Sequence, residues 1–222
     1  MSLFTERDRQ ILNHVGRYRI TTLDVLQRLF FPTAGRTAVS KVVSRLAQMG
    51  RLREERLSGP RKYLRLTPRA AEEVNASRRS GEPITEQTLP VLLGILAYCT
   101  NRGIERFTPA EFRSQFPELC TPARPIAAYV VDSHAGRTGL ALLLVDRDTS
   151  PRRLLAKVRK LIGQRYRIPG FLSLIQDRRF SVIILTGFLD KQIEIQRAFD
   201  RFHRGPTSVR VELVEELAKL IG

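Results

Sequence analysis

One stretch of the sequence places cationic and small hydroxyl side chains at the spacing of a helix surface. The segment 36–49 repeats apolar side chains at helical intervals, which predicts a buried stripe of Val39, Val42 or Val43, Leu46 and Met49. The other positions would form an outer face of Arg36, Thr37, Ser40, Lys41, Ser44 and Arg45. Arginine and lysine suit phosphates or guanine, and serine and threonine can bond to either. This face therefore has the chemistry to contact double-stranded DNA.

A second basic group follows in two short strand-like runs. The runs 51–57 and 61–66 are joined by Ser58-Gly59-Pro60, where Gly59 permits a tight turn and Pro60 sets its geometry. The predicted hairpin carries four cations that suit adjacent phosphates or the minor groove, namely Arg53, Arg56, Arg61 and Lys62.

Cap and stop residues predict the helices that must hold these groups. Thr5 is a good N-cap, and Asp8 places negative charge in the first turn of the first helix. Thr21 or Thr22 opens a second helix, which Pro32 ends because the residue before proline is pushed out of the helical region.

The third helix and the hairpin are closed in the same way. Gly50 is the residue expected just past a helix end, and Thr67-Pro68 caps and begins a further helix. Three helices, a hairpin and a closing helix predict a winged helix-turn-helix over residues 1–80.

The charge of the chain favours a polyanionic partner. Its 222 residues include 38 Lys and Arg against 22 Asp and Glu, a formal net charge of +16. Residues 1–80 hold 17 of these cations and 7 of the acids, so over half of the excess lies on about a third of the chain. Such a field steers association with nucleic acid. The alternatives are a merely solvated basic surface, or a winged helix that binds protein.

Composition excludes several classes of protein. The chain is 42% hydrophobic and 27% charged, which is typical of a globular protein rather than a disordered one. No apolar run reaches the ~18 residues of a membrane span, and no signal peptide is evident. Cys99 and Cys120 are too few for a disulfide framework, and we expect both to be reduced. We expect a cytoplasmic, nucleoid-associated protein with no membrane contact and no cofactor.

The rest of the chain predicts a second domain. Residues 76–88 are polar, contain Gly and Pro, and indicate a linker; we assign residues 81–122 to linker and connecting helices. An apolar helix over 89–101 would pack within the chain or form a dimer contact. Thr108-Pro109-Ala110-Glu111 is a capping box that begins a short helix.

Residues 123–222 alternate between strand and helix patterns. We expect a hairpin of strands 126–132 and 138–146, a buried strand over 180–186 and a last strand over 208–213, with helices from Ser150-Pro151 to about Gly163, over 189–203 and at the end. The predicted fold class is α+β, with a small mixed sheet flanked by helices after the winged helix.

The second domain also carries short motifs in a fixed order. Arg124-Pro125 precedes one strand, Val145-Asp146-Arg147-Asp148-Thr149 follows another, and Lys157 and Tyr166 come after it. With the N-terminal run 3–12, this order resembles the replication-relaxation family. That resemblance implies a winged helix coupled to a restriction-endonuclease-like domain, of the kind found on plasmids and integrative elements.

The sequence departs from the family pattern where a nuclease would need acids. The family has an Asp after Arg-Pro and a Glu before Val-Asp, and here Ile126 and Leu144 hold those places. A metal-dependent nuclease needs two or more carboxylates converging on Mg²⁺ and a lysine to help activate water. The remaining candidates either rebuild such a site or are strand-end and surface charges: Asp132, Asp146, Asp148 and Lys157. We expect a nuclease-like domain with no metal and no catalysis.

Other catalytic signatures are missing from the sequence. It has no phosphate-binding glycine loop, no Gly-x-Ser-x-Gly and no His-Glu-x-x-His. His14, His134 and His203 are isolated, so we interpret them as structural or surface residues. A second basic cluster either adds DNA contacts or is a solvated helix face: Arg152, Arg153, Arg159, Lys160, Arg165 and Arg167.

These observations predict a sequence-specific double-stranded DNA-binding protein, a transcriptional regulator of a plasmid or mobile element that acts as a homodimer. One alternative is a DNA-processing accessory in replication, relaxation or transfer. The other is an active nuclease with a rearranged site.

Overall fold

The computed structural model describes residues 4–58, 61–122, 127–134 and 136–221 of the chain. It divides into two compact units, Met1–Ala97 and Tyr98–Gly222, which we call the first and second units. The fold class is α+β, as predicted. Within the described residues, no helix combines the length and apolar character that a membrane span requires.

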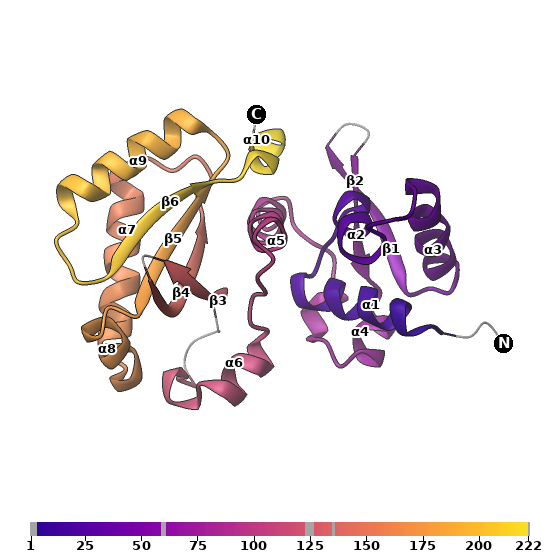
Figure 1. Cartoon of the computed structure of the whole chain (residues 1–222), viewed down its shortest axis with the longest axis horizontal. Coiled ribbons are helices and arrows are strands. Elements are labelled where there is room, and N and C mark those ends of the chain that lie inside the picture. The colour runs from indigo at the N-terminus through magenta and orange to yellow at the C-terminus, as the bar shows by residue number, and fades with distance from the viewer. Residues whose placement is uncertain (1–3, 59–60, 123–126, 135, 222) are drawn as a thin grey trace. The chain divides into compact units, whose positions relative to one another are not determined.

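The first unit has the predicted order of elements (Figure 1). Three helices precede an antiparallel hairpin and a fourth helix: α1 (Glu6–Tyr18), α2 (Leu23–Phe30), α3 (Arg36–Gln48), β1 (Leu52–Ser58), β2 (Arg61–Leu66) and α4 (Pro68–Glu73). Gly59 and Pro60 of the predicted turn lie outside the described residues.

The structure settles which threonine caps α2. The Thr22 side chain accepts a hydrogen bond from the Val25 amide at 3.3 Å. Thr21 instead pairs with Leu64 of β2, exchanging two backbone hydrogen bonds of 2.9 and 2.8 Å. The chain between α1 and α2 is thus tied to the hairpin, which fixes both helices against β2.

The core of the first unit follows the predicted apolar stripes. Val43, rather than Val42, is fully buried on α3, and Val42 packs against the edge of the cluster. The central side chains come from all three helices and from β2: Ile11, Leu12, Val15, Leu26, Val39, Leu46, Leu64 and Leu66. Gly50 ends the α3 region with φ +67°, a backbone conformation that favours glycine.

The segment 76–88, predicted as a linker, begins as part of the first unit. A 3-10 turn, η1 (Arg78–Ser80), is bound by hydrogen bonds from Ser80 Oγ to the Gly16 carbonyl (3.0 Å) and from Arg19 Nε to the Arg79 carbonyl (2.9 Å). Gly81 lies so close to Pro68 that a Cβ there would be 2.6 Å from the Pro68 Cα atom. Close backbone contact, which composition does not reveal, explains the difference from the prediction.

Two helices lead into the second unit. The predicted apolar helix, α5 (Leu89–Arg102), crosses the boundary between the units. Helix α6 (Pro109–Gln115) has the predicted capping box, with Thr108 and Glu111 exchanging hydrogen bonds of 2.8 and 3.2 Å. The 3-10 turn η2 (Pro117–Leu119) follows it.

The second unit is built on a mixed four-stranded sheet in the order β3-β4-β5-β6. Strand β3 is antiparallel to β4, and the other pairs are parallel. The strands are β3 (Tyr129–His134), β4 (Arg137–Val145), β5 (Phe180–Thr186) and β6 (Ser208–Leu213). Parallel neighbours need crossover connections, and helices supply them here: α7 (Pro151–Tyr166), α8 (Pro169–Gln176) and α9 (Leu189–Phe202), with α10 (Glu215–Ile221) at the end. Helices α7 and α9 contact each other along one side of the sheet (Figure 1).

Several elements in this unit differ from the sequence prediction. Helix α7 continues to Tyr166 instead of ending near Gly163, and α8 was not predicted at all. Strands β3 and β4 extend to His134 and Arg137, so the hairpin connection is shorter than the predicted 133–137. Gly136, at φ +74°, provides the left-handed residue that a short hairpin connection needs. Ile126, the expected first strand residue, lies outside the described part of the chain.

His14 is held in a mostly apolar position on α1. Its ring centroid lies 5.0 Å from that of Tyr18 and 5.6 Å from that of Phe30, and Nε2 is 3.2 Å from Thr21 Oγ1. Burial and the nearby positive charge of Arg17 lower the pKa of His14 from 6.5 to about 4. The folded chain therefore keeps this imidazole neutral at pH values where the unfolded chain protonates it.

The first prediction concerns acid sensitivity. The pKa of His14 is lower in the folded chain than in the unfolded chain. The contribution of His14 to the free energy of unfolding is therefore fully present above pH 6.5 and is lost as the pH falls toward 4. Between about pH 7.5 and pH 5 the free energy of unfolding should decrease by about 2 kcal/mol from this group. Urea titrations followed by circular dichroism should show that decrease in the wild type and in the control His134→Gln, whose histidine is exposed. It should be missing in His14→Gln, and an equal decrease there would contradict the assignment.

Candidate nucleic-acid interface

The outer face of α3 is a continuous polar surface. Arg36, Thr37, Lys41 and Ser44 are exposed, and Ser40 is half-buried among them. Val39, Val43 and Leu46 point into the core, so the core fixes which side of α3 faces outward. The five polar side chains thus lie on one helix face, as predicted from their spacing.

The start of α3 adds positive potential to this face. Gly35 is the N-cap, and glycine has no side chain that could accept a hydrogen bond from the first turn. The first amide groups of a helix carry partial positive charge when they are not capped by an acceptor. Arg36 reinforces it, because its 3.4 Å ion pair with Asp24 is exposed on both sides and therefore weak.

Arg45 differs from the other predicted contact residues because the carboxylate that matches its charge is buried. Its Nη2 atom lies 2.6 Å from Asp8 Oδ1, and the Asp8 side chain is 1% exposed. The other Asp8 oxygen accepts the Thr5 amide at 2.9 Å, which closes the capping box of α1. Burial raises the pKa of Asp8, but hydrogen bonds from Arg45 and Thr5 outweigh that effect and hold the pKa below its usual value. Arg45 therefore joins α3 to α1.

The hairpin divides its four cations between two faces. Arg56 and Lys62 are direct cross-strand partners, on the face that continues from Leu64 and Leu66 of the core. Arg53 is opposite Arg65 and thus belongs to the other face, since successive side chains alternate along a strand.

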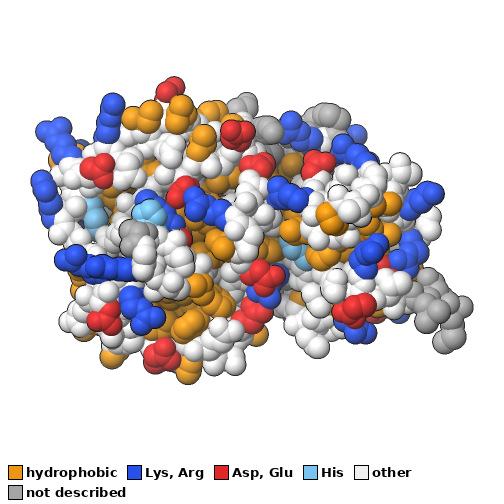
Figure 2. Space-filling view, in the orientation of Figure 1, with side chains coloured by type: hydrophobic (Ala, Val, Ile, Leu, Met, Phe, Trp, Pro, Cys, Tyr) orange, Lys and Arg blue, Asp and Glu red, His pale blue; other side chains and the backbone are white. Residues whose placement is uncertain are grey.

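Not all four cations are equally available to a ligand. Arg61 precedes Lys62, so it too belongs to the face of Arg53. All four are exposed, but Lys62 forms an ion pair with Glu54. On the face that Arg56 shares with Lys62, Arg56 is therefore the cation that forms no ion pair among the described residues. Figure 2 shows Lys and Arg side chains gathered over the hairpin end and over α3.

A buried arginine supports the hairpin from behind. Arg65 is 3% exposed, and its Nε and Nη2 atoms donate to Glu55 Oε1 at 3.1 and 2.9 Å. Its Nη1 atom donates to the Gly81 carbonyl at 3.1 Å. This side chain thus ties β1, β2 and the chain after η1 together, so the hairpin has a fixed base.

The acids considered for a metal site do not converge in the second unit. Asp132 on β3 is opposite Gly139 of β4, and Asp146 follows seven residues after Gly139, just past the end of β4. At a strand rise of about 3.3 Å per residue, they are about 23 Å apart, too far to bind one metal ion. Asp132 is also engaged by Arg210, whose Nη1 and Nη2 atoms donate to its oxygens at 2.7 and 2.6 Å.

The other members of that set have separate surroundings. Asp146 is buried and accepts a hydrogen bond from the Thr149 amide at 2.9 Å. Asp148 is 3.5 Å from Lys191, and Lys157 is exposed on α7. Leu144 is a half-buried strand residue. No group of three or more His, Cys, Asp or Glu suited to a metal is found among the residues that the structure describes.

The second basic cluster is split by the fold. Five of its members are exposed: Arg152, Arg153, Arg159, Lys160 and Arg167. Arg165 is 8% exposed and lies inside the unit. The sequence does contain a sign of this burial that the prediction overlooked. Arg165 continues the apolar stripe of Leu154, Val158 and Ile162 at helical spacing.

Comparison of the chain with protein-family models, with curated proteins and with solved structures gives no match. Its function is therefore inferred from the geometry above.

The second prediction tests the joint between α1 and α3. Asp8→Ala removes a buried carboxylate that accepts from both Arg45 and Thr5, and should lower the free energy of unfolding by about 2–3 kcal/mol. Glu6→Ala, which removes an exposed acid of the same helix paired with exposed Arg9, should change it by less than about 0.5 kcal/mol. Urea unfolding at neutral pH measures the free energy of unfolding of both variants. Equal decreases would show that the Asp8–Arg45 pair does not contribute to stability.

Proposed function

We propose that the chain is a sequence-specific double-stranded DNA-binding protein whose first unit acts as a winged helix-turn-helix. In this proposal α3 enters the major groove, and the β1–β2 hairpin contacts the neighbouring phosphates or minor groove. The observation that carries it is the exposed polar face of α3, which combines cations with small hydroxyl side chains on a helix fixed by its buried side.

The dimensions and chemistry suit this arrangement. An α-helix is about 10–12 Å wide with its side chains, and the major groove of B-DNA is about 12 Å wide. Side chains at the start and middle of such a helix meet base edges and phosphates. Thr37, Ser40 and Ser44 are short, so the helix backbone can approach the bases closely while Arg36 and Lys41 reach further.

The roles of the contact residues follow from their partners. Arg36, Lys41 and Arg56 would bind phosphates or guanine, and the hydroxyl residues would read base edges. Arg45 would act as a positioning residue, because Asp8 holds its guanidinium. Phosphate contacts supply affinity and salt dependence, whereas only base contacts give sequence preference.

We further propose that the protein is a transcriptional regulator of a mobile element. The motif order in the second unit resembles the replication-relaxation family, which supports a regulator carried on a plasmid or integrative element and acting at the nucleoid. The alternative role is that of an accessory in replication or transfer. Mapping the bound sites across a genome distinguishes the two roles, since a regulator occupies promoters and such an accessory occupies an origin.

The third prediction removes charge from the α3 face. Arg36→Ala and Lys41→Ala should each weaken binding to a mixed-sequence DNA duplex and should lower the slope of log K against log salt by about 1. Arg69→Ala on α4 is the matched control, because it removes an exposed arginine from an element whose main contacts are with η1, α1 and β2. Fluorescence anisotropy at several salt concentrations gives both quantities. Wild-type slopes in both α3 variants would remove α3 from the binding surface.

We also propose that the chain binds DNA as a homodimer. The start of α9 supports this, because Phe188, Leu189 and Ile193 are apolar and exposed by 42, 57 and 40%. Leu189 and Ile193 are one turn apart, so they share a helix face that a second copy could cover.

The fourth prediction concerns this apolar face. Leu189→Glu should convert a dimer to a monomer in sedimentation experiments and shrink the DNase footprint from two half-sites, whose centres are roughly 34 Å apart, to one. Phe202→Glu is the control, because Phe202 is exposed near the far end of α9 and projects from its opposite side. A wild-type chain that sediments as a monomer and protects a site without an inverted repeat would contradict the dimer.

A further inference from the structure

We propose that the second unit binds a small amphipathic carboxylate, whose acid group pairs with Arg165 and whose apolar part fills the adjoining pocket. This inference is independent of DNA binding, because it depends only on residues within the second unit.

The pocket is of a size and composition that suit a small organic ligand. It has a volume of about 400 Å³, within the range of about 300–1,000 Å³ that is usual for such sites. Its walls come from α6, η2, β3, α7 and α8, and are mainly apolar: Phe112, Leu119, Ala127, Tyr129, Ile168 and Phe171. Thr121 and Gln164 also line the pocket and add polar groups to it. A ligand here would meet three aromatic rings together with aliphatic side chains.

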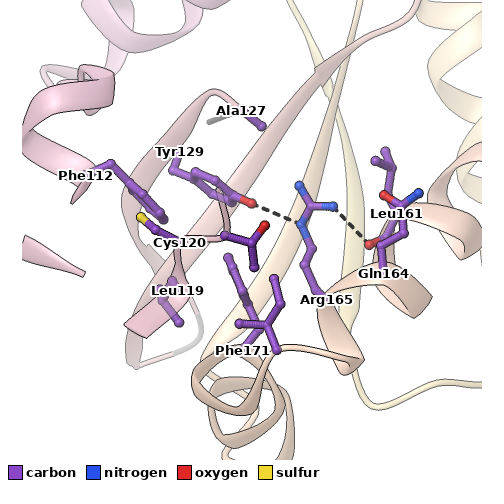
Figure 3. A pocket seen from close by; sticks show the side chains of 11 residues that line it. Phe112, Leu119, Cys120, Ala127, Tyr129, Leu161, Gln164, Arg165 and Phe171 are labelled. Atoms are coloured by element: carbon purple, nitrogen blue, oxygen red, sulfur yellow. Dashed lines mark hydrogen bonds between the residues drawn. The ribbon is translucent and has the colours of Figure 1, made fainter. Parts of the chain in front are cut away.

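Arg165 is the charged group of this pocket. Figure 3 shows its guanidinium beside the Tyr129 ring, with Nε donating to Tyr129 Oη at 3.0 Å and Nη1 donating to the Leu161 carbonyl at 3.0 Å. The guanidinium carbon also lies 5.8 Å from the ring centroids of Tyr129 and Phe171. These contacts hold the fork in one place, yet they use only part of its five N–H groups.

Two other deeply placed arginines among the described residues each have a carboxylate. Arg65 is paired with Glu55, and Arg210 with Asp132. For Arg165, by contrast, the described residues include no Asp or Glu within ion-pair distance. A buried charge is costly unless it is paired, and neutral hydrogen bonds repay only part of that cost. A bound anion would supply the missing partner.

The chemistry favours a carboxylate over a phosphate. The planar fork of one guanidinium matches the two oxygens of one carboxylate, whereas a doubly charged phosphate needs more positive charge than one arginine supplies. Arg165 lies among aromatic and aliphatic side chains, so the rest of the ligand should be apolar. Aryl-acetates and short fatty acids have this combination.

The test compares phenylacetate with phenylacetamide, which has nearly the same shape without the charge. Calorimetric titration of the full chain should give saturable binding of phenylacetate, and at least about tenfold weaker binding of the amide, because a hydrogen-bonded charge pair is lost. Octanoate and octanamide repeat the comparison for an aliphatic ligand. This comparison uses the wild-type chain, so it does not depend on the folding of any variant.

Two matched variants place the ligand at the pocket. Arg165→Met keeps an unbranched apolar side chain and should weaken phenylacetate binding at least about tenfold while leaving the amide unchanged. Arg167→Met removes an exposed arginine two residues away and should bind phenylacetate as the wild type does. Methyl resonances of Ile168 and Leu119 should shift on titration. The proposal is overturned if neither carboxylate saturates at millimolar concentration, if acid and amide bind equally, or if Arg165→Met binds phenylacetate normally.

Discussion

A charged side chain that folding removes from water needs an opposite charge or several hydrogen bonds, and this chain has far fewer acids than bases to meet that need. Several of the acids pair with arginines inside the fold. Asp8 neutralises Arg45 and fixes α3 on α1, while Glu55 holds Arg65 at the base of the hairpin. Asp132 does the same for Arg210 across the sheet of the second unit.

The same shortage of acids shapes the surface. With several carboxylates engaged inside, Lys41 and Arg56 are left exposed on α3 and on the hairpin, and the remaining acids, such as Asp24, form only weak pairs. An excess of surface cations on a rigid helix and an adjacent hairpin is what a DNA-binding unit requires. The internal pairs therefore set both the position of the proposed interface and its net charge.

In the second unit, sheet geometry decides what chemistry is available. Asp132 and Asp146 belong to neighbouring parts of the sequence, but the register of β3 on β4 places them far apart along the sheet. Helix α7, needed to connect two parallel strands, brings Arg165 over Tyr129 and Phe171. The described acids are thus kept apart, while α7 encloses an arginine beside the pocket for which we propose an anionic ligand.

The sequence by itself determined the α+β class and most of the elements, because caps, prolines and apolar periodicity act within a few residues of the chain. Thr5, Thr67 and Thr108 each mark a helix start in the structure. The tertiary structure alone decided which partners the enclosed cations meet, since Arg45 meets Asp8 37 residues away and Arg165 meets Tyr129 36 residues away. Such partners are brought together by packing of the whole unit, which no local pattern records.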